Sequence, residues 1–219
     1  MSEPLTLTSL PLFPLGTVLF PGGTLALRIF EVRYLDMIGR CHKTGAPFGV
    51  VTLTQGSEVR RPDPDASGGN GFAQEAFHSV GTLAAISEFS APQSGLMVIR
   101  CSGTQRFRIA SRQQLRHGLW TANVAPQADD LRVKIPDDLQ GVANALECLI
   151  NSLHARAVPP EQMPLQPPYL LDDCGWVANR WCELLPMPVT LKQQLMVLDN
   201  PLLRLELVGD FLSRSEIAR

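Results

Sequence analysis

The sequence predicts an α+β protein, in which a compact barrel or strongly bent sheet precedes a helical bundle. Short β-rich runs divided by Pro and Gly fill most of the first 125 residues. One segment among them has the apolar spacing of a short helix, and helical spacing returns after residue 136. Strands grouped in one part of a chain and helices in another are typical of the α+β class.

The composition is that of a globular protein of 219 residues, with 45% apolar and 18% charged residues. The formal net charge of −2 argues against a dedicated nucleic-acid binder, which usually carries a basic excess. No apolar run approaches the roughly 18 residues of a membrane span, and the polar N-terminus lacks the pattern of a signal peptide. Five cysteines without a C-x-x-C pair favour reduced thiols, so we expect a cytoplasmic protein with no membrane contact.

Short strands are expected throughout the first half of the chain. They lie at residues 10–13, 18–20, 24–29, 48–53, 80–89, 96–101, 106–109 and 119–124. A Ser-Gly-Thr turn at 102–104 joins two of them. A short helix at 31–42 carries one apolar stripe, formed by Phe30, Tyr34, Met37, Ile38 and Cys41. Residues 54–77 are expected to form a long loop, either a disordered insertion or a functional lid or binding loop.

The second half of the chain has the signals of a bundle of about four helices. Apolar residues recur at helical spacing over 139–153, 176–185, 191–198 and 202–214, with a Pro-rich break at 158–168. Asp172 or Asp173 can cap the second of these helices. Thr190 and Gln193 form a capping box for the third, and Asn200 before a proline opens the fourth.

These patterns divide the chain into a strand-rich domain at 1–125, a connector at 126–136 and a helical domain at 137–219. Charge divides with them. Residues 1–136 carry 13 basic and 10 acidic side chains, whereas residues 137–219 carry 6 and 11.

Seven stretches of the first half have a characteristic order and spacing. They are LPLFPL (10–15), VLFPG (18–22), LALRI (25–29), FEVRY (30–34), FGVV (48–51), VGTLA (80–84) and GTQRFRI (103–109). Together they resemble the Lon substrate-binding domain, which opens ATP-dependent Lon proteases and also occurs alone in small bacterial proteins. The resemblance is clear over about residues 8–125 and looser over the helical half.

The resemblance implies a PUA-like β-barrel with an inserted short helix, followed by an α-helical subdomain. It also implies a non-catalytic module that binds proteins or peptides. The expected partners are unfolded or extended protein segments, with a protease or chaperone as a further candidate. The family motif falls on positions with a structural role, namely Phe30, Glu31, Arg33, Tyr34, Gly103 and Arg106. A ligand-binding role remains the alternative for Glu31, Arg33 and Tyr34.

No residue pattern points to catalysis. The chain contains neither the G-x-x-x-x-G-K-[ST] phosphate loop nor H-E-x-x-H, and its length leaves no room for an ATPase or a Ser-Lys protease domain. We therefore expect no enzyme activity and neither cofactor nor metal.

One local feature favours a different function. No Asp or Glu occurs between Glu88 and Asp129, a stretch that includes a candidate basic face of Arg100, Arg108, Arg112 and Arg116. Because PUA-like folds also serve RNA-binding proteins, this face could bind nucleic acid. The alternatives are a solvated basic face, or one docked on the acidic helical half.

Overall fold

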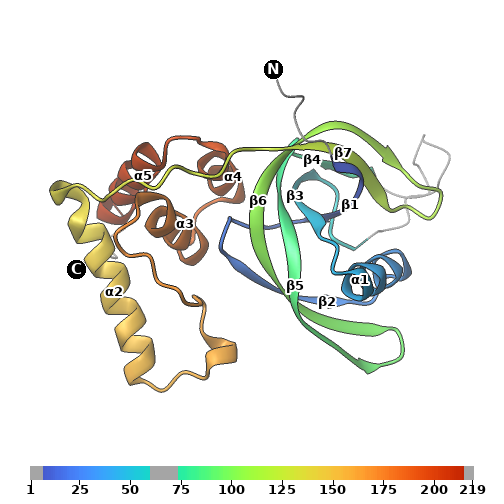
Figure 1. The fold of residues 1–219 in the computed structure, drawn as a ribbon, viewed down its shortest axis with the longest axis horizontal. Coiled ribbons are helices and arrows are strands. Elements are labelled where there is room, and N and C mark those ends of the chain that lie inside the picture. Colours follow the sequence, from blue (N-terminus) through green and yellow to red (C-terminus); the bar gives the residue numbers. More distant parts are fainter. Residues whose placement is uncertain (1–6, 60–73, 215–219) are drawn as a thin grey trace. The chain divides into compact units, whose positions relative to one another are not determined.

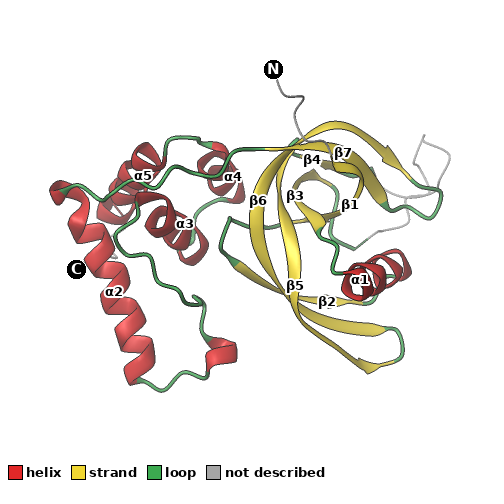
Figure 2. Ribbon diagram, in the orientation of Figure 1, coloured by secondary structure: helices red, strands yellow, loops and turns green. Residues whose placement is uncertain are grey.

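The computed structural model describes residues 7–59 and 74–214, which divide into two compact units. The barrel unit contains the described residues up to Pro21 and those from Leu25 to Ala128. The helical unit contains Gly22–Thr24 and the described residues from Asp129 onward. Strands dominate the first unit, and helices and loops the second (Figure 2).

The barrel unit is a bent, mostly antiparallel sheet with one helix (Figure 1). Its strands are β1 (Leu7–Leu15), β2 (Thr24–Ile29), β3 (Phe48–Gln55), β4 (Ala76–Phe77), β5 (Val80–Gln93), β6 (Leu96–Gln114) and β7 (Trp120–Pro126). β1, β7, β6, β5 and β3 pair in that order, and a parallel pairing of β1 with β3 closes the ring. The predicted α+β class and its barrel are confirmed.

Two apolar clusters cover opposite faces of this sheet. Leu12 of β1 and Val51 of β3 belong to the interior cluster, together with Phe107. Their chain neighbours Phe13 and Val50 belong to the second cluster, which α1 (Val32–Thr44) covers. Because successive strand residues point to opposite faces, strands buried on both sides need continuous apolar sequence. The unbroken FGVV run of β3 meets this requirement.

Helix α1 packs its predicted apolar stripe onto the second cluster, with Tyr34, Met37, Ile38 and Cys41 buried. Glu31 is its N-cap residue, and the helix ends at Gly45, whose φ of 67° suits a residue without a Cβ. The prediction is wrong for Phe30. This residue precedes the helix, and 55% of its surface is exposed.

Two strand predictions are corrected by the structure. Residues 102–104 are not a turn, because β6 runs unbroken through them. Residues 18–20 are buried but form no strand. Part of their backbone bonds to a side chain instead of a β-ladder, since the Thr82 hydroxyl donates to the carbonyl of Leu19 at 2.6 Å. Most of the predicted 54–77 loop lies outside the described residues, although its end forms β4.

The helical unit holds four α-helices, as predicted. They are α2 (Gln140–Ala155), α3 (Cys174–Leu184), α4 (Val189–Val197) and α5 (Pro201–Arg214), with short 3-10 turns at Asp137–Leu139 and Pro160–Gln162. Asp173 caps α3 by accepting from the Trp176 amide at 3.0 Å, and Asn200 caps α5. The Thr190–Gln193 capping box is wrong, because α4 begins directly after Pro188, two residues too early for Thr190 to be its cap.

Candidate functional site

A hollow of about 210 Å³ in the barrel unit is the candidate binding site. It is lined by Phe13, Leu15, residues 26–31, Tyr34, Glu58 and Val59. We call it the β2 groove, since six consecutive residues from β2 and the turn after it line it. These residues are brought together from β1, β2, the start of α1 and the segment after β3.

The floor of the β2 groove is apolar and rigidly held. Phe13, Leu15, Ile29 and Tyr34 are each at least 94% buried. The rings of Phe13 and Tyr34 stack with their centroids 4.0 Å apart, at an angle of 22°. Both rings belong to the α1-covered cluster, so the groove opens directly onto part of the hydrophobic core.

The rim of the groove presents apolar side chains to solvent. Phe30 is 55% exposed and Val59 is 44% exposed, and both line the hollow. Val32, the first residue of α1, is 74% exposed. Exposed aromatic and aliphatic groups beside an apolar hollow are typical of sites that bind other proteins. The sequence could have signalled this, because Phe30 precedes the helix cap and so lies outside the helical stripe.

Arg33 anchors the start of α1 through a buried ion pair. Its Nη2 donates to Glu75 Oε1 at 3.0 Å and its Nη1 to the Gly118 carbonyl at 2.8 Å, with side-chain exposures of 4% for Arg33 and 5% for Glu75. Trp120 Nε1 donates to Glu75 Oε2 at 2.8 Å. Glu31 adds a contact to Arg33 Nε at 3.4 Å. Arg33 therefore pairs with a buried carboxylate 42 residues further along the chain.

The electrostatics of Arg33 keep it charged. Burial alone would lower the pKa of its guanidinium, but hydrogen bonding to Glu75 and the nearby charges outweigh that effect and raise the pKa. Its guanidinium carbon also lies 4.5 Å from the centroid of the Tyr34 ring. Arg33 thus holds the Tyr34 ring in place at the groove floor, and its role is to position that ring.

The remaining motif residues lie away from the groove. Gly103 sits in β6, where an added Cβ would come within 2.3 Å of the Phe20 carbonyl. Arg106, two strand residues further on, is 4% exposed and donates from Nη2 to the Ala128 carbonyl at 3.4 Å. The structure therefore groups Phe30, Glu31 and Tyr34 at one hollow and separates them from these two.

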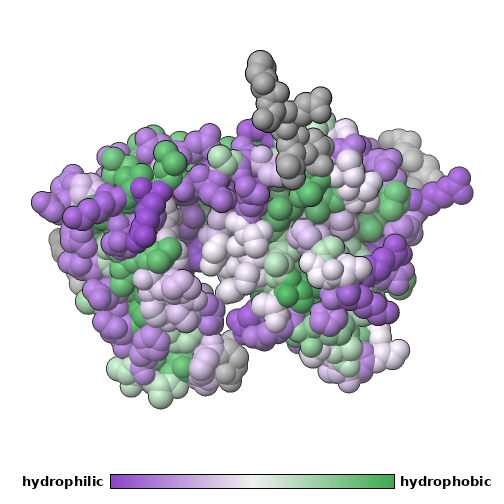
Figure 3. All heavy atoms as spheres, viewed as in Figure 1, coloured by the Kyte–Doolittle hydropathy of each residue, from purple (hydrophilic) through white to green (hydrophobic). Residues whose placement is uncertain are grey.

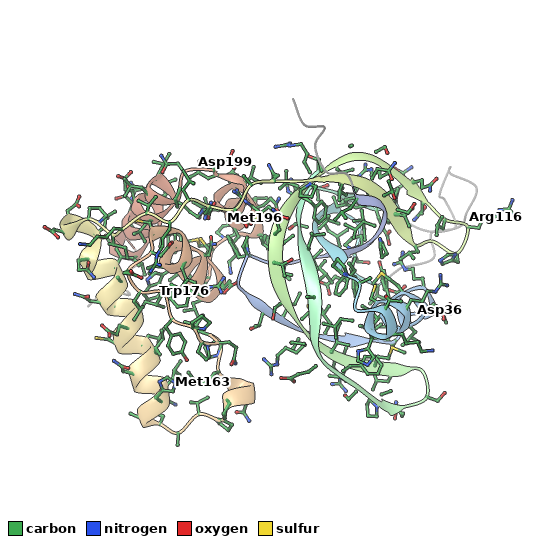
Figure 4. The ribbon with its side chains drawn as sticks, viewed as in Figure 1. Asp36, Arg116, Met163, Trp176, Met196 and Asp199 are labelled. Carbon is green, nitrogen blue, oxygen red and sulfur yellow. The ribbon has the colours of Figure 1, made fainter. Side chains whose placement is uncertain are left out.

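The four arginines of the predicted basic face do not share one side of the sheet. A bulge between Ile109 and Ser111 reverses the alternation of β6, so Arg108 and Arg112 point to opposite faces. Arg112 lies over the Phe77 ring at 4.5 Å, and Arg100 Nε pairs with Glu88 at 3.3 Å. Arg116 points outward at the β6–β7 turn (Figure 4). Nucleic-acid binding by this set stays a prediction.

Two further hollows lie on the barrel unit. One of about 210 Å³ runs between β2 and the β5–β6 hairpin and shares Ala26 with the β2 groove. The other, of about 320 Å³, has a polar lining that includes Ser9, Ser111 and Asn123.

Within residues 7–59 and 74–214, no group of three or more His, Cys, Asp or Glu side chains could hold a metal ion. No helix of this part of the chain is long and apolar enough to span a bilayer.

The size and lining of the β2 groove suit side chains of a polypeptide. Pockets for small molecules and cofactors are typically about 300–1,000 Å³, and this hollow is smaller. It offers apolar contact at its floor, and its lining also includes the carboxylates of Glu31 and Glu58. Hydrophobic residues reach the surface in several separate areas of the face shown in Figure 3, among hydrophilic ones.

Comparisons with known proteins agree with this architecture. Residues 9–214 match the family model of the ATP-dependent protease La (LON) substrate-binding domain. The crystal structure of a Lon N-terminal domain protein from Xanthomonas campestris is similar, with 31% identity and a TM-score of 0.69, and the match covers 93% of this chain and 98% of that one. The N-terminal domain of a Mycobacterium avium complex Lon protease shares the fold at 14% identity, with a TM-score of 0.57 and coverage of 94% and 98%.

No curated protein matches the chain. The family match spans nearly all the described residues, and the X. campestris structure matches over almost its full length. The sequence resemblance is thereby confirmed, and the chain belongs to the Lon substrate-binding domain family.

Proposed function

We propose that this chain is a non-catalytic module that binds unfolded or extended segments of other proteins through the β2 groove. The observation that carries the proposal is the exposed Phe30 beside an apolar hollow whose floor is part of the core. Membership of a substrate-binding family supports a protein ligand. A native protein keeps its apolar side chains buried, so a site of this kind favours chains that expose them.

The groove offers more than a scattered exposed side chain. Its aromatic floor is held in place by the Phe13–Tyr34 stack and by Arg33. A preorganised floor loses little conformational entropy when a ligand side chain enters, so more of the burial energy is available for binding. Complete burial of a Phe side chain contributes about 1.5–3 kcal/mol. Phe30 is already half-buried, so its share in a complex is about 1 kcal/mol.

Binding to a permanently unfolded protein tests the proposal. Reduced, carboxymethylated α-lactalbumin is a suitable probe, with titration followed by fluorescence anisotropy. Phe30→Ser should weaken binding by about fivefold to tenfold, since each 1.4 kcal/mol is a tenfold change. Leu131→Ser is the matched control, because Leu131 is 79% exposed and belongs to the helical unit. Equal affinity of the two variants for the unfolded protein would show that the β2 groove is not the binding site.

The proposed setting is the cytoplasm. All five cysteines are free thiols, and four of them are buried. Proteins of reducing compartments keep their thiols in this state. A protease or chaperone that uses segments held in the groove is the partner that we propose for the complex.

A further inference from the structure

The β2 groove lies beside the backbone of the outer edge of β2 as well as beside apolar side chains. The β2 groove touches every residue from 26 to 31. Successive strand residues point to opposite faces, so a hollow on one face would meet only every second residue. Contact with all four strand residues among them, 26–29, therefore places the hollow along the edge of β2, where N–H and C=O groups point.

Within the described parts of the chain, this edge has no strand partner. β2 pairs with β6, and no second strand pairs with it among residues 7–59 and 74–214. Phe13 and Leu15 of β1 face the groove with their side chains and not with a ladder of hydrogen bonds. An edge of this kind is a template for an added strand.

We infer that an extended polypeptide segment adds to the outer edge of β2 as a further strand, with apolar side chains at alternate positions and a basic side chain at the α1 end. The inference rests on the proposed function and names the ligand of that site. Residues 26–30 span about 17 Å at the rise of a β-strand, enough for two or three ladder residues.

The apolar side chains of the added strand have places to go. Alternate residues can enter the β2 groove, and Ala26 of its lining also lines the neighbouring hollow at the β5–β6 hairpin. Phe89 and Ile99 line the second hollow and extend the apolar lining.

Charge complementarity sets the flanking residue of the ligand. Glu31 and Glu58 both line the groove, and Glu31 is the N-cap residue of α1. Arg33 beside the groove contacts Glu31 at 3.4 Å and Glu75 at 3.0 and 3.4 Å, so these two carboxylates share one guanidinium. Among the described residues of the lining, Arg28 of β2 is the one cation. The described groups at and beside the groove are three carboxylates (Glu31, Glu58 and Glu75) and two guanidinium groups, which favours a lysine or arginine after the apolar residues of the ligand.

Backbone methylation of a peptide tests strand addition directly. The probe is the acetylated, amidated peptide KTLTFTLTK, titrated against the full chain. In an extended strand the N–H groups of alternate residues point to opposite edges. N-methylation of the three apolar residues and N-methylation of the four Thr residues therefore block opposite edges. We expect one of the two methylated peptides to bind about tenfold more weakly than the unmethylated peptide, since two or three hydrogen bonds are lost. The affinity of the other methylated peptide should change by less than threefold.

Each outcome decides the inference. Loss of affinity in only one of the two methylated peptides supports strand addition. Equal tolerance of both methylated peptides, equal loss in both, or binding of unfolded protein without any binding of KTLTFTLTK would overturn it and leave the proposed function standing. Binding of neither the peptides nor carboxymethylated α-lactalbumin would overturn both.

The predicted preference for a basic residue in the ligand is tested separately. A peptide with Glu in place of both Lys residues should bind about fivefold more weakly at low salt, and Glu58→Gln should reduce that difference. Gln retains an acceptor for the Gly16 amide, which Glu58 Oε1 binds at 2.7 Å. Glu147→Gln on α2 is the matched control and should leave the difference unchanged. An unchanged difference in Glu58→Gln would overturn the assignment of the basic residue.

Discussion

At the scale of single residues, position relative to a helix end decides what a side chain does. Phe30 and Tyr34 are four residues apart and fit one helical stripe in the sequence, yet Tyr34 is buried and Phe30 is exposed. The difference arises because Glu31 is the N-cap, so Phe30 lies outside the helix and does not follow its periodicity. Arg33 illustrates the opposite case, because its charge is buried and satisfied by a partner 42 residues away.

The thiols also differ by burial. Cys41, Cys101, Cys174 and Cys182 are buried, whereas Cys148 is exposed on α2. Burial raises the pKa of Cys101 and of Cys182 to about 12. Because the thiolate is the reactive form, these groups are both shielded and protonated at neutral pH.

One thiol per native chain is therefore expected to react rapidly with Ellman's reagent at pH 8, and five in denaturant. Cys148→Ser should abolish the rapid phase, and Cys41→Ser should leave it intact. A second rapid thiol in the native protein would contradict the burial of the other four.

At the scale of elements, long-range contacts override local signals. Ser102-Gly103-Thr104 has turn residues, but β6 continues through it as one strand of nineteen residues. Gly103 is used for close approach, because the backbone of Phe20 passes directly over it. The 18–20 segment in turn loses its strand character, since it lies on the sheet and does not join it.

Gly103→Ala is expected to destabilise the barrel unit by about 2 kcal/mol or more, because a Cβ there has no space and the obstructing atoms include backbone. Urea unfolding monitored by circular dichroism measures the change. Gly39→Ala on α1 is the matched control, since its Cβ would meet only the end of Met97 at 3.8 Å. The control should be neutral or slightly stabilising, as alanine favours helix. Similar stability of both variants would show that the Phe20 backbone gives way.

Helix ends were more predictable than strand ends. Asp173 and Asn200 cap their helices as expected, because a capping side chain bonds to amides two or three residues away. The Thr190–Gln193 box fails although its residues fit the motif. Lys192 N already bonds to the Pro188 carbonyl at 3.0 Å, so α4 has begun before Thr190.

At the scale of the whole molecule, each unit has its own means of cohesion. The barrel unit uses two apolar clusters on the two faces of one sheet. The helical unit is joined around Arg204, which is 1% exposed. The guanidinium of Arg204 pairs with Asp130, donates to Asn179 Oδ1 at 3.0 Å and to the Leu195 carbonyl at 2.9 Å. It thereby connects α3, α4 and α5 to the segment that enters the unit.

Arg204→Met should destabilise the helical unit by about 3–5 kcal/mol, because it removes the buried guanidinium that pairs with Asp130 and bonds to Asn179. Trp176 and Trp181 report on this unit and Trp120 on the barrel, so fluorescence in a Trp120→Phe background isolates the helical transition. Arg214→Met is the matched control, since Arg214 is an exposed arginine of the same helix. An unshifted helical transition in Arg204→Met would exclude the central role of Arg204.

The sequence by itself determined the class, the order of most elements and the family. These features depend on local periodicity, on capping residues and on motif order, all of which are readable along the chain. Only the tertiary structure decided which apolar residues stay exposed and which distant groups meet. The β2 groove combines residues 13, 26–31 and 59, and the Arg33–Glu75–Trp120 network spans 88 positions. Such associations depend on how the sheet bends and closes, which no local pattern encodes.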